Sequence, residues 1–356
     1  MAEESDEITG ETRTISSEKI PEDYRYPGAY VEVDGEYGMI ESIIGGRARV
    51  DFGHSRRNDK RKDREETYNH RRKCFVPKEY PTTPDLSIEY DKLDKEKVIG
   101  DGGGGNVKKA NVQTSDGNVT LAIKEPRHSD TLHIEQVERM LHEAETWDKL
   151  DDHDHIVGVV DYSDKPLPWI ALEYMDGGNL RDRAREMDVP QALWTAIAVT
   201  KGVRHAHRRG VAHLDLKPEN VLFRTVENAW DVPKVADWGV SQRLLVQSNG
   251  VEGVSPRYSA PEQVDEHYGQ ADDLTDIYQL GLMFYETFTG RPPFHGSASD
   301  VTQAVLTDEP TPPSEIADLP TDLDDILLTA LSKEKDDRYE DIVYLRDDLR
   351  NVFDSL

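Results

Sequence analysis

Residues 213–220 read His-Leu-Asp-Leu-Lys-Pro-Glu-Asn, and the string Asp237-Trp238-Gly239 begins 17 positions after Asn220. Asp215 can accept a proton from an attacking hydroxyl, and Lys217 can neutralise charge on a phosphoryl group in transfer. Asn220 and Asp237 supply hard oxygen ligands of the kind that Mg²⁺ prefers. A string Asp-x-Lys-x-x-Asn also occurs by chance in loops, so it predicts a site for a metal-bound triphosphate only with support from elsewhere.

A glycine-rich stretch upstream supplies that support. Residues 99–107 read Ile-Gly-Asp-Gly-Gly-Gly-Gly-Asn-Val, in which Gly100, Gly102, Gly105 and Val107 fit the pattern G-x-G-x-x-G-x-V. Glycine lets the backbone approach phosphates closely and adopt positive φ. Lys124 closes an apolar, strand-like run, and such a lysine directs its ammonium off a sheet toward an anion. In a dinucleotide-binding fold this position would fall in a helix, so the combination excludes chance.

These motifs together resemble the eukaryotic-type Ser/Thr protein kinases, in the branch found also in prokaryotes, from about Tyr90 to Leu349. The resemblance implies an α+β, bilobal protein-kinase fold with a small β-rich lobe and a larger helical lobe. It also implies ATP as the phosphoryl donor, Mg²⁺ (with Mn²⁺ as an alternative) as the metal, and proteins as substrates.

The same resemblance assigns roles to individual residues. Lys124 is implied to contact the α- and β-phosphates and to pair with a helix glutamate, for which Glu143 is preferred over Glu145 and Glu138. The implied catalytic set is Asp215, Lys217, Lys124 and Glu143, and the implied metal ligands are Asn220 and Asp237. The residues implied to bind ATP are Gly100, Gly102, Gly103, Gly105, Val107, Ala122, Lys124, Glu173 and Met175, the last two in a hinge after a gatekeeper Leu172.

Further matches in the second lobe concern the scaffold. Ala260-Pro261-Glu262 closes an activation segment that opens at Asp237, and the resemblance implies a buried ion pair between Glu262 and Arg338. Asp276, near the start of an expected central helix, is implied to hold the backbone of the catalytic loop.

The sequence also departs from the family pattern. Leu214 stands where the family often has an arginine that grips a phosphate on the activation segment, so we expect activity that does not depend on phosphorylation there. Trp238 replaces the usual Phe. Ser255 stands where Thr is usual, and together with Lys217 it favours Ser/Thr over Tyr specificity. Ser241, Ser248 and Ser255 are candidate autophosphorylation sites.

Two other functional classes compete with an active protein kinase. A pseudokinase, which binds nucleotide or acts as a regulatory scaffold without transfer, predicts loss of Lys124, Asp215, Asn220 or Asp237, yet all four are present. Small-molecule kinases share the fold core but usually lack an Ala-Pro-Glu segment, so they rank third.

The chain is expected to contain four parts: an acidic, disordered tail (1–23), a small β-barrel-like module (24–80), a proline-containing linker (81–89) and a kinase domain (90–350, with lobes 90–175 and 176–350). The module rests on strands at 30–33, 38–44 and 47–52, separated by two-residue turns, with a closing strand at 73–76 that would give an SH3-like barrel. Residues 56–73 hold nine Lys or Arg, so the module has an unknown protein or a nucleic acid as candidate partners, although a solvated loop is the favoured interpretation.

The net charge is −28, from 71 acidic and 43 basic residues. Residues 1–87 contribute only −4 of it, so the acidity is spread over the kinase region. Such a surface stays soluble when salt screens the repulsion, which predicts a halophilic source, a haloarchaeon in particular, and disfavours binding to nucleic acid or anionic membranes by the kinase lobes.

A cytoplasmic location is expected from three observations. Cys74 is the only cysteine, which suits a reducing compartment. No apolar run approaches the 18 residues of a membrane helix, and the acidic N-terminus is unlike a signal peptide. The chain also ends shortly after its last expected helix, so we expect no membrane anchor.

Overall fold

The computed structural model describes residues 76–102, 105–115, 117–127, 134–239 and 256–356, together with β13 (Gln242–Arg243) and four strands between Thr12 and Asp51. The chain divides into two compact units, Met1–Cys74 and Phe75–Leu356. The boundary therefore lies at residue 74, not at residue 80 as expected from the prolines.

The N-terminal unit contains an antiparallel sheet of four strands in the order β1-β4-β3-β2. β2 (Tyr30–Val33), β3 (Glu36–Ile44) and β4 (Arg47–Asp51) lie within two residues of the expected strands. β1 (Thr12–Ser16) corrects the expectation of a disordered tail over 1–23, because it pairs with β4 from Thr12↔Asp51 to Ser16↔Arg47. Residues 73–75 lie outside the described part of the chain, so the SH3-like barrel stays a prediction.

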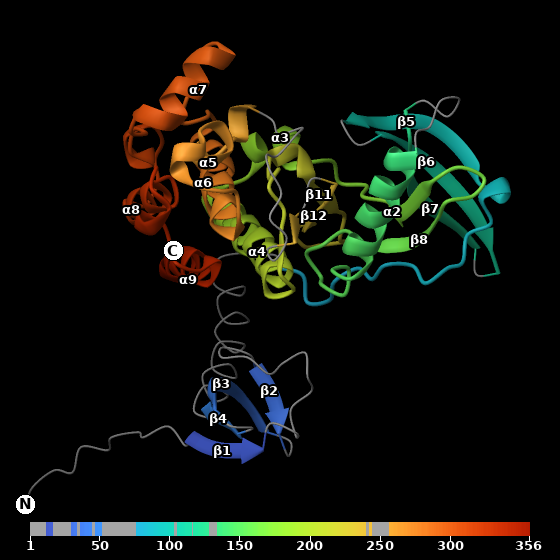
Figure 1. Cartoon of the computed structure of the whole chain (residues 1–356), viewed down its shortest axis with the longest axis horizontal. Helices are drawn as coiled ribbons and strands as arrows, with labels where there is room; N and C mark the ends of the chain where they lie inside the picture. The colour runs from blue at the N-terminus through green and yellow to red at the C-terminus, as the bar shows by residue number, and fades with distance from the viewer. Residues whose placement is uncertain are drawn as a thin grey trace, which may run out of the picture. The chain divides into compact units, whose positions relative to one another are not determined.

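The first lobe of the second unit is a five-stranded antiparallel sheet with one long helix (Figure 1). Its strands are β5 (Asp94–Gly102), β6 (Gly105–Thr114), β7 (Gly117–Glu125), β8 (Val159–Ser163) and β9 (Trp169–Glu173), in the order β5-β6-β7-β9-β8. Helix α2 (Ile134–Asp148) buries Met140, Ala144 and Trp147, which lie at helical spacing on one face. The Trp147 indole also donates to the Val157 carbonyl at 2.6 Å, which fixes the helix beside the sheet.

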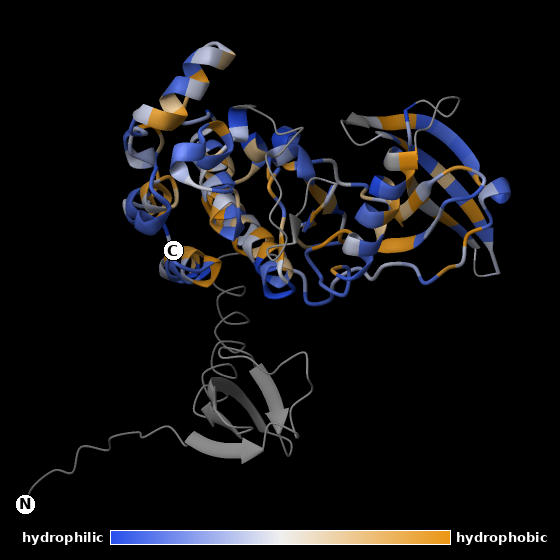
Figure 2. Ribbon diagram, viewed as in Figure 1, coloured by the Kyte–Doolittle hydropathy of each residue, from blue (hydrophilic) through white to orange (hydrophobic). Residues whose placement is uncertain are grey.

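The second lobe is helical and is built around two long, largely buried helices, α4 (Val189–Arg208) and α6 (Asp273–Thr289). Asp188 caps the N-terminus of α4, and α6 begins with Asp272 in a capping box and ends at Gly290 in the left-handed conformation. Shorter elements complete the lobe: α3 (Leu180–Arg183), α5 (Pro261–Val264), α7 (Ala298–Thr307), α8 (Asp322–Ala330), α9 (Ile342–Ser355), and the strands β10 (Val211–Ala212), β11 (Val221–Arg224) and β12 (Val232–Val235). Figure 2 shows apolar residues on the inward faces of these elements and polar residues outside.

The expected linker, residues 81–89, is instead packed against the second unit, Phe75–Leu356, which is called the catalytic unit below because it contains both lobes of the expected kinase fold. Ile88 is buried in the core of the sheet lobe with Leu121 and Trp169, and its N–H donates to Asp161 Oδ2 at 2.7 Å. At Gly158 a Cβ atom would lie 1.8 Å from Thr83 Oγ1, so the segment approaches the backbone too closely for any side chain there. Residues 81–89 therefore form part of the catalytic unit.

Among the helices of the described residues, none has the length and apolar character that a membrane crossing requires.

Candidate active site

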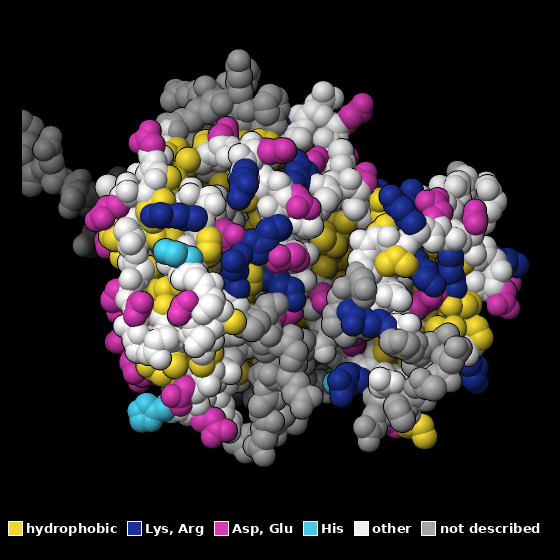
Figure 3. Space-filling view, turned by 90° about the horizontal axis from the view of Figure 1, so that it is seen from above, with side chains coloured by type: hydrophobic (Ala, Val, Ile, Leu, Met, Phe, Trp, Pro, Cys, Tyr) yellow, Lys and Arg dark blue, Asp and Glu magenta, His cyan; other side chains and the backbone are white. Residues whose placement is uncertain are grey.

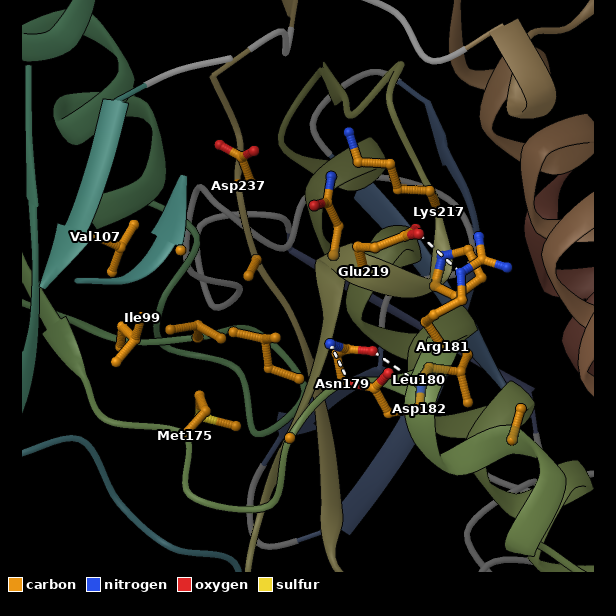
Figure 4. Close-up of a pocket in the computed structure, with 18 of the residues that line it drawn as sticks. Ile99, Val107, Met175, Asn179, Leu180, Arg181, Asp182, Lys217, Glu219 and Asp237 are labelled. Carbon is orange, nitrogen blue, oxygen red and sulfur yellow. Dashed lines mark hydrogen bonds and ion pairs between the residues drawn. The ribbon is translucent and has the colours of Figure 1, made fainter. Parts of the chain in front are cut away.

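A cleft of about 1540 Å³ separates the two lobes of the catalytic unit. Its wall includes residues from both lobes that the sequence pointed to: Gly100, Gly105, Val107, Ala122, Lys124, Glu173, Met175, Lys217, Asn220 and Asp237. Figure 4 shows Val107, Ile99 and Met175 on one side of this space and Lys217 on the other, with Asp237 between the lobes. Glu143 and Asp215 are buried and are not among the lining residues, but the lysines with which they pair, Lys124 and Lys217, line the cleft. Gly103 lies outside the described residues.

The glycine-rich segment forms the β5–β6 hairpin, in which Gly102 is paired with Gly105. Gly105 has φ of +142°, and a Cβ atom there would lie 2.4 Å from the Glu125 carbonyl oxygen. Any other residue would therefore have to push β6 away from β7. This close approach keeps β6 next to β7, and Gly105 and Val107 line the cleft.

Lys124 lies near the end of β7, where pairing with both β6 and β9 holds its backbone. Its ammonium donates to Glu143 Oε1 at 2.5 Å and to Asp237 Oδ1 at 2.8 Å. Burial opposes the charged form, but the two carboxylates outweigh it and raise the pKa of Lys124. Lys124 in turn lowers the pKa of Asp237, so that both groups are ionised.

Hydrogen bonds to side chains of helix α6 hold the backbone of the catalytic loop, residues 213–220. Asp276 accepts hydrogen bonds from the His213 N–H at 2.8 Å and the Leu214 N–H at 2.7 Å, as the resemblance implied. Gln279 adds a second clamp, because its side chain accepts from the Leu216 N–H at 2.9 Å and donates to the Leu214 carbonyl at 3.1 Å. The backbone that carries Asp215 is thereby fixed on the most buried helix of the lobe.

Two residues of this region have left-handed backbone, Leu214 with φ of 64° and Asp237 with φ of 65°. Such conformations cost about 1–3 kcal/mol each in residues other than glycine, and they concentrate at functional sites. The hydrogen bonds that the Leu214 N–H donates to Asp276 and the Leu214 carbonyl accepts from Gln279 offset the cost at Leu214. The Leu214 side chain is uncharged and fully buried, so this position supplies no cation that could bind a phosphate at the surface.

Asp215 is buried and forms an ion pair with Lys217, and the Asn220 amide nitrogen donates to the Asp215 carbonyl at 2.9 Å. The cleft thus brings an ionised Asp237 and the amide of Asn220 to one wall. Both side chains offer hard oxygen atoms, so the residues present fit a Mg²⁺ ion.

Glu173 differs from the expectation in one respect. Its backbone borders the cleft, but its side chain is buried, accepts from Lys234 Nζ at 2.6 Å and from the Gly158 N–H at 2.7 Å. The carboxylate therefore serves to join the hinge to β12, and only the backbone of Glu173 is available to a nucleotide. Lys234 was not among the predicted site residues, although a lysine within the buried strand Val232–Val235 is itself a signal for a buried partner.

Other expectations concern the surroundings of the site. The predicted ion pair between Glu262 and Arg338 is confirmed, with two contacts of 2.8 Å. Trp238 is buried, and its ring lies 4.6 Å from that of His213. The segment that contains Ser241, Ser248 and Ser255 lies outside the described residues, so its expected roles stay predictions.

A cluster on the helical wall of the cleft was not foreseen. Arg181 Nε donates to Glu219 Oε1 at 2.8 Å and Arg181 Nη1 to Glu286 Oε1 at 2.5 Å, and the Tyr258 hydroxyl bonds to both Arg181 and Glu286. These residues come from α3, the catalytic loop, α6 and the segment before α5, so no local spacing in the sequence could predict that they form a cluster.

Comparison with known proteins identifies the class to which this fold and cleft belong. The protein kinase domain model matches residues 93–343, and the chain therefore belongs to the protein kinase family. The serine/threonine-protein kinase PknB of Mycobacterium leprae is 32% identical over 216 residues, which cover 56% of this chain and 34% of the relative. A probable serine/threonine-protein kinase of Corynebacterium efficiens is 36% identical over 250 residues (64% and 36%), and one of Clostridium perfringens is 31% identical over 278 residues (75% and 38%). The chain spans little more than a third of the length of these relatives.

Proposed function

We propose that this protein is a protein serine/threonine kinase that transfers the γ-phosphate of ATP to Ser and Thr hydroxyls of proteins, its own included. The observation that carries the proposal is the pairing of Lys124 with both Glu143 and Asp237 on one side of the cleft, opposite the Asp215–Lys217 pair. Family membership and the names of the relatives support the same activity.

The chemistry that follows is mainly positioning and charge stabilisation, because phosphoryl transfer asks for little covalent chemistry from the protein. Lys124, held by Glu143, binds phosphate oxygens, and the β5–β6 hairpin covers the phosphates and excludes water. Asp215 orients the acceptor hydroxyl and takes its proton, while Lys217 stabilises charge on the transferred group. Asn220 and Asp237 would hold Mg²⁺, which supplies charge neutralisation between the phosphates when it is bound.

The test is an Asp215→Asn variant assayed on a generic protein substrate, with phosphosites mapped by mass spectrometry. We expect turnover to fall by about 10²- to 10⁴-fold while ATP binding remains, because only the proton acceptor is lost. Asp336→Asn, at an exposed acid outside the cleft, is the matched control and should keep wild-type turnover. Wild-type protein that bound ATP without transferring phosphate to any protein would favour the pseudokinase alternative.

The acidic composition supports a second, independent proposal about the source of the chain. We infer a salt-adapted, haloarchaeal origin and a cytoplasmic location from the net charge of −28 and the single cysteine. Screening of self-repulsion should raise the melting temperature as KCl increases from low to molar concentration. Stability that fell over this range would contradict the inference.

For the N-terminal unit we propose recruitment of a partner, either a protein or a nucleic acid, through an SH3-like module with the basic stretch 56–73. Deleting residues 1–74 cuts at the boundary between the two units. An unchanged autophosphorylation rate after this deletion would favour recruitment, whereas a changed rate would indicate control of the kinase itself.

A further inference from the structure

Among the acids that line the helical side of the cleft are Glu219 and Glu286. Both are already engaged by one guanidinium, that of Arg181, which bonds to each of them. Figure 4 shows the contact between Arg181 and Glu219 at the edge of the cleft. The Tyr258 hydroxyl bonds to both Arg181 and Glu286 and completes the cluster. A substrate cation would have to displace Arg181 to use these acids.

Three other cations on the same wall are in the opposite situation. Arg185, Arg257 and Arg291 line the cleft with exposed side chains, and within the described residues none of them forms an ion pair. They come from the turn after α3, the segment before α5 and the turn after α6, so the fold gathers them from three separate parts of the chain. Arg181 thus neutralises Glu219 and Glu286, and Arg224 pairs with Asp176. Three cations of the lining but one acid, Asp182, are left exposed without an ion pair among the described residues.

This excess of free positive charge contrasts with the chain as a whole, whose net charge is −28. Figure 3 shows several Lys and Arg side chains gathered on this face beside the cleft, with single Asp and Glu side chains among and around them. A strongly acidic surface repels an acidic partner in general, and a local basic patch then focuses such a partner at one place. Charge complementarity of this kind sets specificity and register more than raw affinity.

We propose that Arg185, Arg257 and Arg291 form a subsite for acidic side chains, so that the preferred substrate is a Ser or Thr hydroxyl flanked by Asp or Glu. The proposal rests on the proposed kinase function and adds the class of protein segment that the cleft accepts. Arg181 is a positioning residue in this arrangement, because it withholds Glu219 and Glu286 from basic substrates.

The test uses three peptides that share one central Thr and differ only in flanking residues, which are Glu, Ala or Lys. The full chain is assayed for kcat/KM at the lowest KCl concentration at which it is folded, because salt screens these contacts. We expect the Glu peptide to exceed the Ala peptide by about tenfold and the Lys peptide to be the poorest, since exposed ion pairs contribute about 3- to 5-fold each at best. Equal values for the three peptides, or a preference for Lys, would overturn the subsite.

Charge-reversal variants locate the effect. Arg257→Glu with Arg291→Glu should abolish or reverse the ratio between the Glu and Lys peptides. The matched control is Lys92→Glu with Lys149→Glu, which makes the same change in net charge at exposed positions outside the cleft and should keep the ratio. A ratio that changed equally in both double variants would show a general charge effect and refute the subsite. In Arg181→Gln, the released carboxylates should raise the relative kcat/KM of the Lys peptide severalfold.

Binding measurements separate this proposal from the kinase proposal. Fluorescent versions of the three peptides are titrated against the full-length Asp215→Asn protein and read by anisotropy. Selective binding of the Glu peptide without transfer by the wild type would support the subsite and refute the kinase function. Phosphate transfer to all three peptides without a preference for the Glu peptide would support the kinase function and refute the subsite. An oligonucleotide of equal charge that competed as well as the Glu peptide would mark a general polyanion surface and would also overturn the proposal.

Discussion

Each lobe of the catalytic unit contains a buried ion pair between a glutamate and a long cation. In the sheet lobe, Lys124 contacts Glu143, with exposed side-chain fractions of 5% and 6%; in the helical lobe, Arg338 contacts Glu262, with both fractions at 0%. By burial and by type the two pairs are nearly the same. Their surroundings, however, differ.

The Arg338 guanidinium has partners from the protein alone. Beyond Glu262 it donates to the carbonyls of Ser332, Leu274 and Lys333 at 2.9 to 3.0 Å, while Thr275 donates to Glu262 at 2.6 Å. We call such a pair closed. The Lys124 pair is open, because the further partner of Lys124 is Asp237, whose side chain is 37% exposed at the cleft. The difference teaches that a closed pair fixes the fold, whereas an open pair keeps a charge available to a ligand.

The largest effect should come from breaking the closed pair with Arg338→Met. Removing one partner of a buried pair typically costs about 3–5 kcal/mol, because the other charge remains buried without compensation. Chemical denaturation at neutral pH, compared with the wild type, measures this loss. A loss below about 1 kcal/mol would show that closure does not confer structural importance.

The same variant has an expected pH dependence. Burial alone would raise the pKa of Glu262, but hydrogen bonds from Arg338 outweigh it and hold that pKa below its ordinary value. The stability supplied by the pair is therefore present above the ordinary glutamate pKa and is lost as pH falls through the lowered value. In Arg338→Met the buried Glu262 can instead take up a proton, so the gap between the variant and the wild type should narrow on acidification.

The open pair should show the opposite balance in Lys124→Met. Turnover should fall by about 10²- to 10³-fold, the usual effect of removing one preorganised charge from an active site. The stability loss should be less than half that of Arg338→Met, because water in the cleft solvates the partly exposed Asp237. Burial also raises the pKa of Glu143, so this second carboxyl can take up a proton once the ammonium is gone. Steady-state kinetics and denaturation on the same preparations give both numbers. Near-full turnover would refute the assignment of Lys124.

A third pair tests whether closure, rather than burial, is the deciding property. Lys234 and Glu173 are both 3% exposed in their side chains, and Glu173 also accepts from the Gly158 N–H. The pair borders the cleft but is closed, so Lys234→Met should cost about 2–4 kcal/mol of stability and less than tenfold in turnover at a temperature where the variant is folded. Lys92→Met, which removes an exposed pair with Glu89, is the control and should lie within about 0.5 kcal/mol of the wild type. A Lys234 variant that lost turnover but not stability would break the comparison.

Which of these groups could be predicted from the sequence depends on the same difference between open and closed pairs. Phosphoryl chemistry demands particular residue types at fixed spacing, so Lys124 and Asp237, which line the cleft, could be located from the sequence alone. The pair of Lys234 and Glu173 joins residues 61 positions apart, and that of Arg181 and Glu286 joins residues 105 apart, with no chemical rule to fix either spacing. Prolines in 81–89 suggested a linker because composition cannot show that Ile88 is buried in the sheet lobe. β1 was missed because Ile15 is its single large apolar residue.

The smallest expected effect concerns phosphorylation of the activation segment. The catalytic loop is closed in the sense used above, since Asp276, Gln279 and Gln263 supply the partners of the Leu214 backbone. Leu214 itself is buried and uncharged, so a phosphate on the segment gains no cation from this position and the loop needs none to keep its shape. Enzyme treated with a phosphatase, freed of it and then assayed within the first turnovers should retain its rate within about twofold, because a lost ion pair at an exposed site contributes little. A tenfold loss, restored by autophosphorylation, would mean that another cation takes the place of the missing arginine and that the catalytic loop is open to control after all.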